Sequence, residues 1–414
     1  MTVHKAFRYR IYPNKTQRAA LAIQFGHARY VFNWGLATRQ EHYEQHGKGL
    51  SYEDTTALLR DLKQTEDHAW LRDANAQVLQ QKLKDLDRAY KNFFEKRKKF
   101  PRFKSRHDQQ AIRYPQRFKF TESRIYLPNV GWVKAVFHRN MEGTPKNVTV
   151  SRTKSGEFYA SVQCEMEAEL PSHNGKPAVG VDVGLKHFAV LSTGEKIEHP
   201  QYLRRSERKL KRLQRRLSRK QKGSANRNKA RVAVARQHQH VTRQRKDFLD
   251  KLSHRLVNEH GVVRLEDLNV RGMVQNHNLA KSISDSGWGE FRRMCEYKAP
   301  WYGSGVEKID RFFPSSKTCH VCGLVNEGLK LRHRFWTCEG CGSEHDRDHN
   351  AAINIEFAPT AGAAESNACG DRVRRNEFHP QRAVVVEAGS PRVFSPGAAH
   401  SPVYHLAEDV KKLE

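Results

Sequence analysis

Two Cys-x2-Cys pairs constrain the fold of this chain more than any other feature of its sequence. Cys319 and Cys322 form the first pair, and Cys338 and Cys341 form the second after an interval of fifteen residues. Two thiolates at this spacing share one tight turn, and two such turns complete the tetrahedral coordination of Zn²⁺. Four thiolates leave no coordination position open, so the motif predicts a structural zinc ion and not a catalytic one. The alternative is four reduced cysteines that bind no metal.

The residues after the second pair predict a helix with two aspartates at its start. In "EHDRDHNAAINI", a helix that begins near Asp346 places Asp348, Ala351, Ala352 and Ile355 on one face. Asp346 is then positioned to cap the helix, whereas Asp348 lies on the face that packs on a sheet. The zinc-binding unit would fix where this helix begins.

Two upstream segments with strand patterns supply further acids. The stretch "AVGVDVGLKHFAVL" carries Asp182 within an apolar strand, where a carboxylate needs a cation or strong hydrogen bonds. The alternative is an aspartate that opens a turn. The stretch "VVRLEDLNV" ends in Glu266 and Asp267, of which Asp267 is the better turn former and Glu266 can share a cation with Asp182. Together with Asp348, these acids could hold two Mg²⁺ ions for attack of water on a phosphodiester.

The charge of the chain predicts a large polyanion as its partner. Lys plus Arg number 74 against 45 Asp plus Glu, which gives a formal net charge of +29. Nucleic acid is the expected partner, because the sequence has no apolar run of membrane-spanning length and no apolar stretch at its N-terminus. The three cysteines outside the pairs do not form a disulfide-like pattern, so we expect a cytoplasmic protein.

The positive charge is concentrated in two segments. Residues 96–120 hold ten Lys/Arg and one acid, interleaved with aromatic residues, a mixture typical of binding to phosphates and stacked bases. The alternative is a solvated loop. Residues 204–246 hold eighteen Lys/Arg and one acid, and their leucine spacing predicts two helices with a break at Gly223-Ser224. The candidate nucleic-acid-binding residues are Lys98, Lys99, Arg102, Lys104 and Arg106 in the first segment, and Arg212, Arg215, Arg216 and Arg219 in the second.

Sequence patterns also suggest the division of the chain. "KAFRYRIYP" alternates like a half-buried strand, helical patterns follow it, and strand patterns return from Arg124 to Met166. "LPSHNGKP" is a linker before a new domain. Residues 359–414 hold seven Lys/Arg and seven Asp/Glu without a helical or strand period, which indicates a disordered tail.

In this order, the segments "VGVDVGLKHFAVL", "VVRLEDLNVRGM", "RFFPSSKTCHVCG" and "WTCEGCGSEHDRDHNAAINI" resemble the TnpB (OrfB) family of insertion-sequence-encoded, RNA-guided nucleases. The resemblance implies an α/β fold with β-barrel and helical parts: a RuvC-like nuclease domain of the ribonuclease H fold, an inserted zinc ribbon, and an N-terminal wedge β-barrel with a helical recognition insert. The implied ranges are 1–12 and 111–170 for the wedge barrel, 13–110 for the recognition insert, 177–314 and 346–358 for the nuclease domain, and 315–345 for the zinc ribbon.

By motif position, the resemblance assigns Asp182, Glu266 and Asp348 as catalytic magnesium ligands and the four paired cysteines as zinc ligands. It further implies a guide RNA from the transposon end, a double-stranded DNA target beside a short flanking motif, and action in a prokaryotic cytoplasm at the nucleoid. Two alternatives stay open. One is a DNA-joining transposase that uses the same acids, and the other is a non-catalytic zinc-ribbon regulator.

Overall fold

The computed structural model describes residues 1–330 and 332–359, so the tail predicted for 359–414 lies outside these residues apart from Pro359. The chain has a mixed α/β fold, as predicted, with one seven-stranded, one five-stranded and one two-stranded sheet in the described ranges. The elements up to residue 167 are β1 (Thr2–Tyr12), α1 (Lys15–His46), α2 (Tyr52–Leu62), the 3-10 helix η1 (Glu66–Asp73), α3 (Ala76–Phe94), β2 (Gln110–Tyr114), β3 (Lys119–Phe120), β4 (Arg124–Leu127), β5 (Gly131–Val136), β6 (Thr144–Arg152) and β7 (Phe158–Glu167).

The second half contains the remaining elements. They are β8 (Ala178–Val183), β9 (His187–Leu191), β10 (Lys196–Glu198), α4 (Tyr202–Ser218), α5 (Ala225–Glu259), β11 (Val262–Glu266), α6 (Val270–Met273), α7 (Ala280–Ser286), α8 (Trp288–Lys298), the 3-10 helix η2 (Ala299–Tyr302), β12 (Gly305–Ile309), β13 (Phe335–Thr337), β14 (Glu344–Asp346) and α9 (Arg347–Phe357). No helix among the described residues is long and apolar enough to cross a membrane.

The N-terminal sheet is antiparallel, with the strand order β2-β6-β7-β1-β5-β4-β3. Strand β1 lies in its interior and pairs with β7 from Thr2 to Ile11. Its alternation buries Phe7, Tyr9 and Ile11 against Leu21 of α1, which confirms the predicted strand. Within the part of the chain that the structure describes, no pairing joins the edge strands β2 and β3, so the predicted closure into a barrel is not seen in the hydrogen bonds.

The helices between β1 and β2 begin where the sequence provides caps. Asn14 precedes α1 and forms a capping box with Gln17, because Asn14 Oδ1 accepts from the Gln17 backbone N–H at 2.8 Å and Gln17 Oε1 accepts from the Asn14 N–H at 3.0 Å. Helices α1 and α3 pack closely, since a Cβ atom at Gly35 would lie 2.9 Å from a methyl carbon of Leu83.

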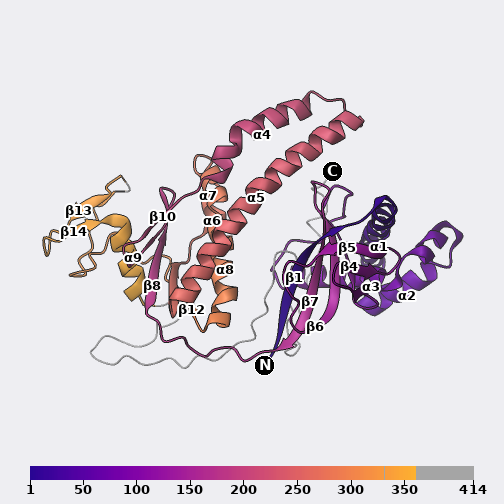
Figure 1. Cartoon of the computed structure of the whole chain (residues 1–414), viewed down its shortest axis with the longest axis horizontal. Helices are drawn as coiled ribbons and strands as arrows, with labels where there is room; N and C mark the ends of the chain where they lie inside the picture. The colour runs from indigo at the N-terminus through magenta and orange to yellow at the C-terminus, as the bar shows by residue number, and fades with distance from the viewer. Residues whose placement is uncertain (331, 360–414) are drawn as a thin grey trace.

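The five-stranded sheet has the order β10-β9-β8-β11-β12. Strands β8, β9 and β10 form an antiparallel meander, whereas β11 and β12 run parallel to β8. Val179 and Val181 of β8 pack with Leu252 and Leu256 of α5 on one face. The intervening Gly180 lies against the backbone of α9 on the opposite face. The sheet is therefore covered by α5 and α8 on one side and by α9 on the other (Figure 1).

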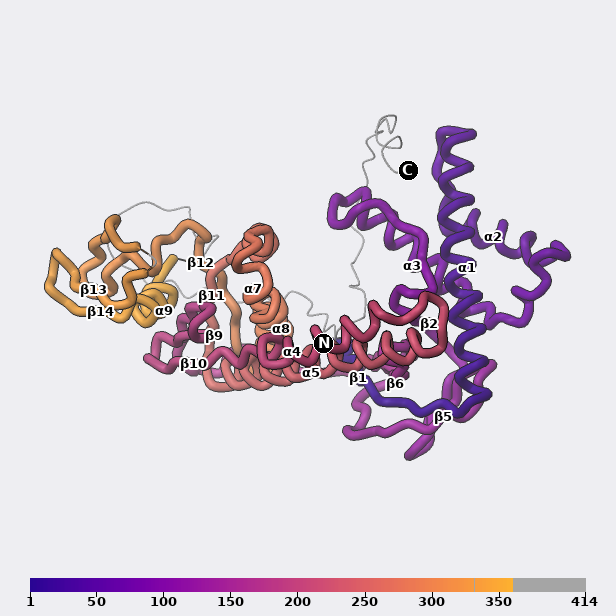
Figure 2. Tube along the Cα trace, turned by 90° about the horizontal axis from the view of Figure 1, so that it is seen from above, coloured from indigo at the N-terminus to yellow at the C-terminus, as the bar shows by residue number. Residues whose placement is uncertain are grey.

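Helices α4 and α5 form the predicted hairpin, with Ser224 as the N-cap of α5. The hairpin extends from the five-stranded sheet toward the N-terminal sheet (Figure 2). Gln239 Nε2 donates to Glu157 Oε2 at 2.6 Å, and Arg243 also pairs with Glu157. Arg10 of β1 reaches the same carboxylate at 2.5 Å, so Glu157 joins α5 to the N-terminal sheet.

Candidate active site and zinc centre

The register of the parallel strands places two of the predicted acids side by side. Val181 of β8 pairs with Leu265 of β11, and these are followed by Asp182 and Glu266, respectively. Both acids therefore lie at the carboxyl ends of adjacent parallel strands, where α/β sheets bind their ligands. Ser315 Oγ donates a hydrogen bond of 2.7 Å to Glu266 Oε1 and orients that carboxylate.

Asp267, next to Glu266, is engaged differently. Its carboxylate pairs with Arg292 at 2.8 Å and with Arg311. Burial opposes its ionisation, but the hydrogen bonds and charges of Arg311 and Arg292 outweigh burial and hold the pKa of Asp267 below its usual value. Asp267 thus fixes the turn after β11, and Glu266 is the acid that remains beside Asp182.

Helix α9 brings the third acid to the sheet. Asp346 is its N-cap, as predicted, because Asp346 Oδ1 accepts from the N–H groups of Asp348 at 3.0 Å and His349 at 3.3 Å. Its other oxygen accepts from Lys196 Nζ at 2.6 Å. Both carboxylate oxygens of Asp346 are therefore engaged, by the helix N-terminus and by Lys196. Asp348, in the first turn of α9, takes no part in this cap through its carboxylate.

Gly180 sets the depth at which α9 lies on the sheet. A Cβ atom at this position would lie 2.0 Å from the Ala352 carbonyl oxygen and 2.5 Å from the Glu356 nitrogen. Only glycine permits this approach of helix backbone to strand. Because Gly180 and Asp182 lie on the same face of β8, the close contact also brings the start of α9 toward Asp182.

The three acids interact electrostatically. Burial raises the pKa of Asp182 to about 8, with further increases from the negative charges of Glu266 and Asp348 and smaller opposing effects from Arg347 and Arg334. Asp348 forms ion pairs with Arg347 at 2.8 Å and with Arg334 at 3.2 Å. The sulfur atoms of the paired cysteines all lie within 4.8 Å of one another. In the described part of the chain, the carboxylate oxygens of the three acids do not form such a group.

The donor set nevertheless fits a hard divalent cation. Carboxylate oxygens are the protein ligands that Mg²⁺ prefers, and they come here from two strands and a helix that surround one point of the sheet. Burial, together with the negative charges of Glu266 and Asp348, disfavours ionisation of Asp182, and Arg334 and Arg347 offset this only in part. A bound cation would stabilise the ionised form of Asp182, and Asp182, Glu266 and Asp348 are the residues that could hold it.

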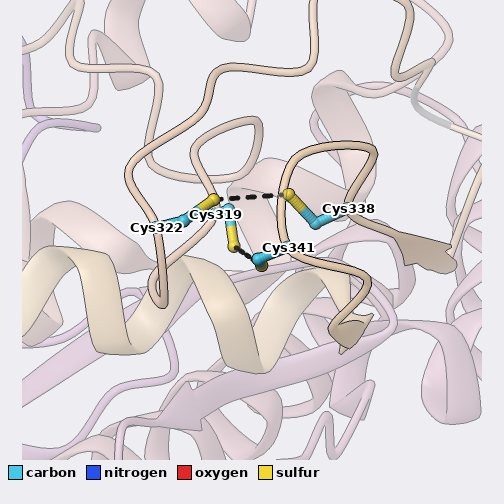
Figure 3. A group of neighbouring side chains, drawn as sticks. All are labelled: Cys319, Cys322, Cys338 and Cys341. Atoms are coloured by element: carbon cyan, nitrogen blue, oxygen red, sulfur yellow. Dashed lines mark hydrogen bonds between the residues drawn. The ribbon is translucent and has the colours of Figure 1, made fainter.

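The four cysteines converge as their spacing predicts (Figure 3). Their sulfur atoms all lie within 4.8 Å of one another, with Cys319 Sγ 3.7 Å from Cys341 Sγ and Cys322 Sγ 3.5 Å from Cys338 Sγ. A tetrahedral zinc site with Zn–S bonds of about 2.3 Å has edges of about 3.8 Å. The thiolate set therefore fits zinc. Strand β13 leads into the second cysteine turn, and its antiparallel partner β14 leads from that turn into α9.

Side-chain amides of α9 attach it to the zinc-binding unit. Asn350 Nδ2 donates to the Thr318 carbonyl at 2.7 Å, and its Oδ1 accepts from the His320 N–H at 3.1 Å. Asn354 Nδ2 donates to the carbonyls of Ser315 at 2.8 Å and Thr318 at 2.6 Å. The first cysteine turn is thus fixed to the helix of Asp348, while Ser315 in the same segment contacts Glu266.

Sequence reasoning missed five residues of this site. They are Ser315, Arg334, Arg347, Asn350 and Asn354. All are within or next to the quoted motifs, but no spacing in the sequence indicates which distant group each one contacts.

The second basic segment forms a continuous positive face. A groove of about 800 Å³ runs along α4 and is lined by Arg205, Arg208, Lys209, Arg212, Arg215, Arg216, Arg219 and Lys220. All four candidates from this segment line the groove. Six of these cations lie on α4 and two directly follow it, and their mutual repulsion favours the binding of phosphates or counterions.

The first basic segment divides its aromatic residues between core and surface. Lys98, Lys99, Arg102, Lys104 and Arg106 lie in the exposed connection between α3 and β2. Tyr114 is buried in the N-terminal core, so its ring is not exposed to a ligand, whereas Phe118 packs against that core and is only partly buried. Phe103, in contrast, is 57% exposed.

Family models match three parts of the chain. Residues 161–277 match OrfB_IS605, described as "Probable transposase", and residues 288–355 match the Cas12f1-like TNB domain. Residues 1–48 match a model of the OrfB_IS605 type described as a helix-turn-helix domain, although the structure forms strand β1 and the single long helix α1 there.

Relatives match nearly the whole chain. A protein of Streptomyces pristinaespiralis named "Putative RNA-guided DNA endonuclease" is 42% identical over 389 residues, which cover 92% of this chain and 93% of that protein. The Escherichia coli K12 protein "Putative RNA-guided DNA endonuclease InsQ" is 36% identical and covers 89% of this chain and 95% of that protein.

Two solved structures share the fold. The Cas12f1 protein of a Cas12f1–sgRNA–target DNA complex superposes with a TM-score of 0.53 at 15% identity, over 87% of this chain and 100% of that chain. The mini-RNA-guided endonuclease CRISPR-Cas_phi3 has a TM-score of 0.51 at 10% identity, over 85% of this chain and 92% of that chain. With the identity to full-length relatives and the OrfB_IS605 match, the resemblance seen in the motifs is confirmed: the chain belongs to the OrfB/TnpB family.

Proposed function

We propose that the chain is an insertion-sequence-encoded, RNA-guided DNA endonuclease that hydrolyses DNA phosphodiesters with Mg²⁺ at Asp182, Glu266 and Asp348. The observation that carries the proposal is the meeting of these acids at the ends of β8 and β11 and the start of α9, where burial and mutual repulsion raise the pKa of Asp182 to about 8. Relatives named as RNA-guided DNA endonucleases support the same activity.

The nuclease domain is proposed to be RuvC-like and of the ribonuclease H fold, built from residues 177–314 and 346–358 around a zinc ribbon of residues 315–345. A three-strand antiparallel meander followed by two parallel strands, in the order β10-β9-β8-β11-β12, supports this proposal. Residues 1–12 and 111–170 would form the wedge unit, and 13–110 the helical recognition insert.

Each residue of the site has a distinct role in this proposal. Mg²⁺ held by the acids would activate water and stabilise charge on the scissile phosphate. Asp182 supplies the central carboxylate, Ser315 orients Glu266, and the cap at Asp346 fixes the helix turn that carries Asp348. Cys319, Cys322, Cys338 and Cys341 would hold Zn²⁺ as a structural ion that keeps Asn350 and Asn354 in contact with the ribbon.

The basic surfaces are proposed to hold the guide RNA and the double-stranded target DNA through their phosphates. The residues are Lys98, Lys99, Arg102, Lys104 and Arg106 before β2, and Arg212, Arg215 and Arg216 on α4 with its C-cap Arg219. The place of action would be a prokaryotic cytoplasm, at the nucleoid. Sequence recognition would come from base pairing with the guide, which leaves backbone contacts to the protein.

Reversing the charge of the α4 face should weaken nucleic-acid binding without changing sequence preference. In a variant with Arg212, Arg215, Arg216 and Arg219 all changed to Glu, each lost phosphate contact should reduce the slope of log Kd against log salt by about one. Binding titrations over a salt series measure this slope. The matched control changes the same four residues to Lys, which keeps the charge and should keep the slope. An unchanged slope in the Glu variant would show that this face does not contact phosphates.

A DNA-joining transposase is the second candidate, because the OrfB_IS605 family is described as "Probable transposase". The nucleic acid that purifies with the chain distinguishes it from the endonuclease. Expression from the native locus, purification of the full chain and sequencing of bound nucleic acid should recover RNA transcribed from the transposon end next to the gene. Recovery of transposon-end DNA without RNA would support the transposase and contradict the proposal.

A further inference from the structure

A groove on α1 is separate from the candidate acids and from the groove along α4. It has a volume of about 380 Å³ and is lined by Gly26, Arg29, Tyr30, Asn33, Trp34, Ala37 and Phe103. Six of these residues lie along one face of α1, and Phe103 comes from the basic connection between α3 and β2. No acidic side chain lines the groove.

Reciprocal hydrogen bonds hold the basic connection against α1. Asn33 Nδ2 donates to the Lys104 carbonyl at 2.9 Å, and Asn33 Oδ1 accepts from the Lys104 N–H at 2.7 Å. Pro101 is buried, whereas Phe103 exposes 57% of its surface although it stands between two anchored positions. An apolar ring held at the surface in this way is available for contact with a ligand.

The other aromatic residues of the groove are fixed from behind. Tyr30 packs against Trp70 with ring centroids 5.0 Å apart and against His68 at 5.7 Å. Trp34 packs against the buried cluster that contains Leu71 and Leu79. Tyr30 and Trp34 are nevertheless only partly buried, so part of each ring faces the groove. Because both rings are already held in place, binding of a ligand would cost little conformational entropy.

The floor of the groove is open because of glycine. A Cβ atom at Gly26 would have no neighbour within 4 Å, so the space above this helix turn is empty of protein. Arg29 lines the groove, and Arg102, Lys104 and Arg106 flank Phe103 in the sequence. A ligand with a flat apolar ring attached to an anionic backbone therefore matches the groove in both shape and charge.

We propose that this groove binds one unpaired nucleobase of a single strand by stacking against Phe103, Tyr30 and Trp34. The inference rests on the proposed nucleic-acid function and adds to it a base-binding site. The Asn33 side chain is engaged with the Lys104 backbone on both its oxygen and its nitrogen, and three rings line the groove, so the proposed contact is stacking, which every base can make. Its contribution to binding is consequently independent of guide sequence.

The test uses the full chain and labelled single-stranded oligomers of about 12 nucleotides, within the range that such sites cover. The probes are oligodeoxythymidine, oligouridine, and abasic oligomers with the same DNA and RNA backbones. Phe103→Ala and Gly26→Leu are each expected to raise Kd for the base-containing oligomers by roughly 5- to 100-fold, the range for loss of one stacked base. Kd for the abasic oligomers should change by less than about twofold, and the salt slope should stay constant because no phosphate contact is lost.

Gly26 also supplies the control for folding. Leu at position 26 would enter the open groove, and both Leu and Ala favour a helix interior over Gly by up to about 1 kcal/mol, so neither variant should unfold α1. Gly26→Ala leaves room for a base and should bind all four probes like the wild type. The difference between the two Gly26 variants isolates occupation of the groove.

The outcomes separate the inference from the proposed function. A larger effect with oligodeoxythymidine assigns the base to DNA, and a larger effect with oligouridine assigns it to RNA. Equal losses on base-containing and abasic oligomers, or no loss in either variant, would overturn the base-binding site while leaving the endonuclease intact. A wild-type chain that bound none of the four probes would contradict both.

Discussion

Asp182→Asn is expected to reduce DNA cleavage by at least about 10³-fold, because the loss of one carboxylate removes several kcal/mol of metal-based transition-state stabilisation. Glu266→Gln and Asp348→Asn should have effects of the same order. Binding of nucleic acid should change by less than about twofold, since the phosphate contacts lie on other surfaces. Cleavage of a labelled target in Mg²⁺ and binding in EDTA measure the two quantities separately.

The stability of the Asp182 variant distinguishes a catalytic role from a structural one. Since burial raises the pKa of Asp182 to about 8 from a usual value of 3.8, the folded protein binds more protons than the unfolded chain between these pH values. The contribution of this group to the free energy of unfolding therefore becomes less favourable as pH rises from about 4 to about 8. Asp182→Asn removes that cost, so the variant should melt no earlier than the wild type at pH 7.5 in EDTA.

Asp267→Asn is the matched control for these substitutions. Asp267 is adjacent to Glu266, but its carboxylate forms partly exposed ion pairs with Arg292 and Arg311, and surface ion pairs contribute about 0–1 kcal/mol. Cleavage should fall by less than about tenfold. If a variant at Asp182 or Asp348 cleaved DNA at the wild-type rate, that residue would not be a catalytic acid. If Asp267→Asn reduced cleavage more than Glu266→Gln, Asp267 and not Glu266 would be the catalytic acid.

Cys338→Ser is expected to lose the zinc ion and to unfold the ribbon. Apparent binding free energies of structural zinc sites are about 10–16 kcal/mol, and this energy stabilises the folded form of the unit. Asn350 and Asn354 tie α9 to the ribbon, so its unfolding should also displace Asp348 and reduce cleavage. Elemental analysis and thermal unfolding of the purified chain measure both losses.

A buried cysteine outside the cluster provides the comparison. Cys164 lies in the core of the N-terminal sheet, so Cys164→Ala should lower the melting temperature but retain the zinc. Wild-type protein without stoichiometric zinc, or Cys338→Ser with its zinc retained, would contradict the structural zinc site.

The residues that could be predicted are those whose role follows from local spacing. Two cysteines separated by two residues form a turn on their own, and the Asp346 cap follows from helix geometry within one turn. Strand alternation likewise indicated the buried face of β1. These features depend on neighbours in sequence, so the sequence carries enough information to identify them.

Other features depend on contacts between distant segments. Ser315 reaches Glu266 across 49 residues, and Arg334 reaches Asp348 across 14. From the sequence, Gly180 is simply a small residue in an apolar strand. Only the packing of α9 shows why a side chain cannot fit there. Aromatic residues of the first basic segment looked equivalent, yet Tyr114 is in the core and Phe103 is on the surface, because β2 turns one face inward.

The closure of the N-terminal sheet is a similar case. Alternation in the sequence predicts strands, but it does not determine whether the edge strands pair with each other. Among the described residues, β2 and β3 do not pair with one another, so closure is not seen in the hydrogen bonds and the wedge barrel stays a prediction.

Programmed cleavage tests the central claim most directly. The full chain would be purified with its bound RNA, that RNA would be sequenced, and DNA duplexes matching or not matching its guide segment would be incubated with the complex in Mg²⁺. Each duplex would carry a randomised flank, so that the short motif beside the target is also sampled. The account predicts cutting of the matching duplex alone, with hydrolysed ends, and no cutting after RNA removal or with Asp348→Asn. Cleavage that ignored the RNA sequence, or strand joining in place of hydrolysis, would contradict it.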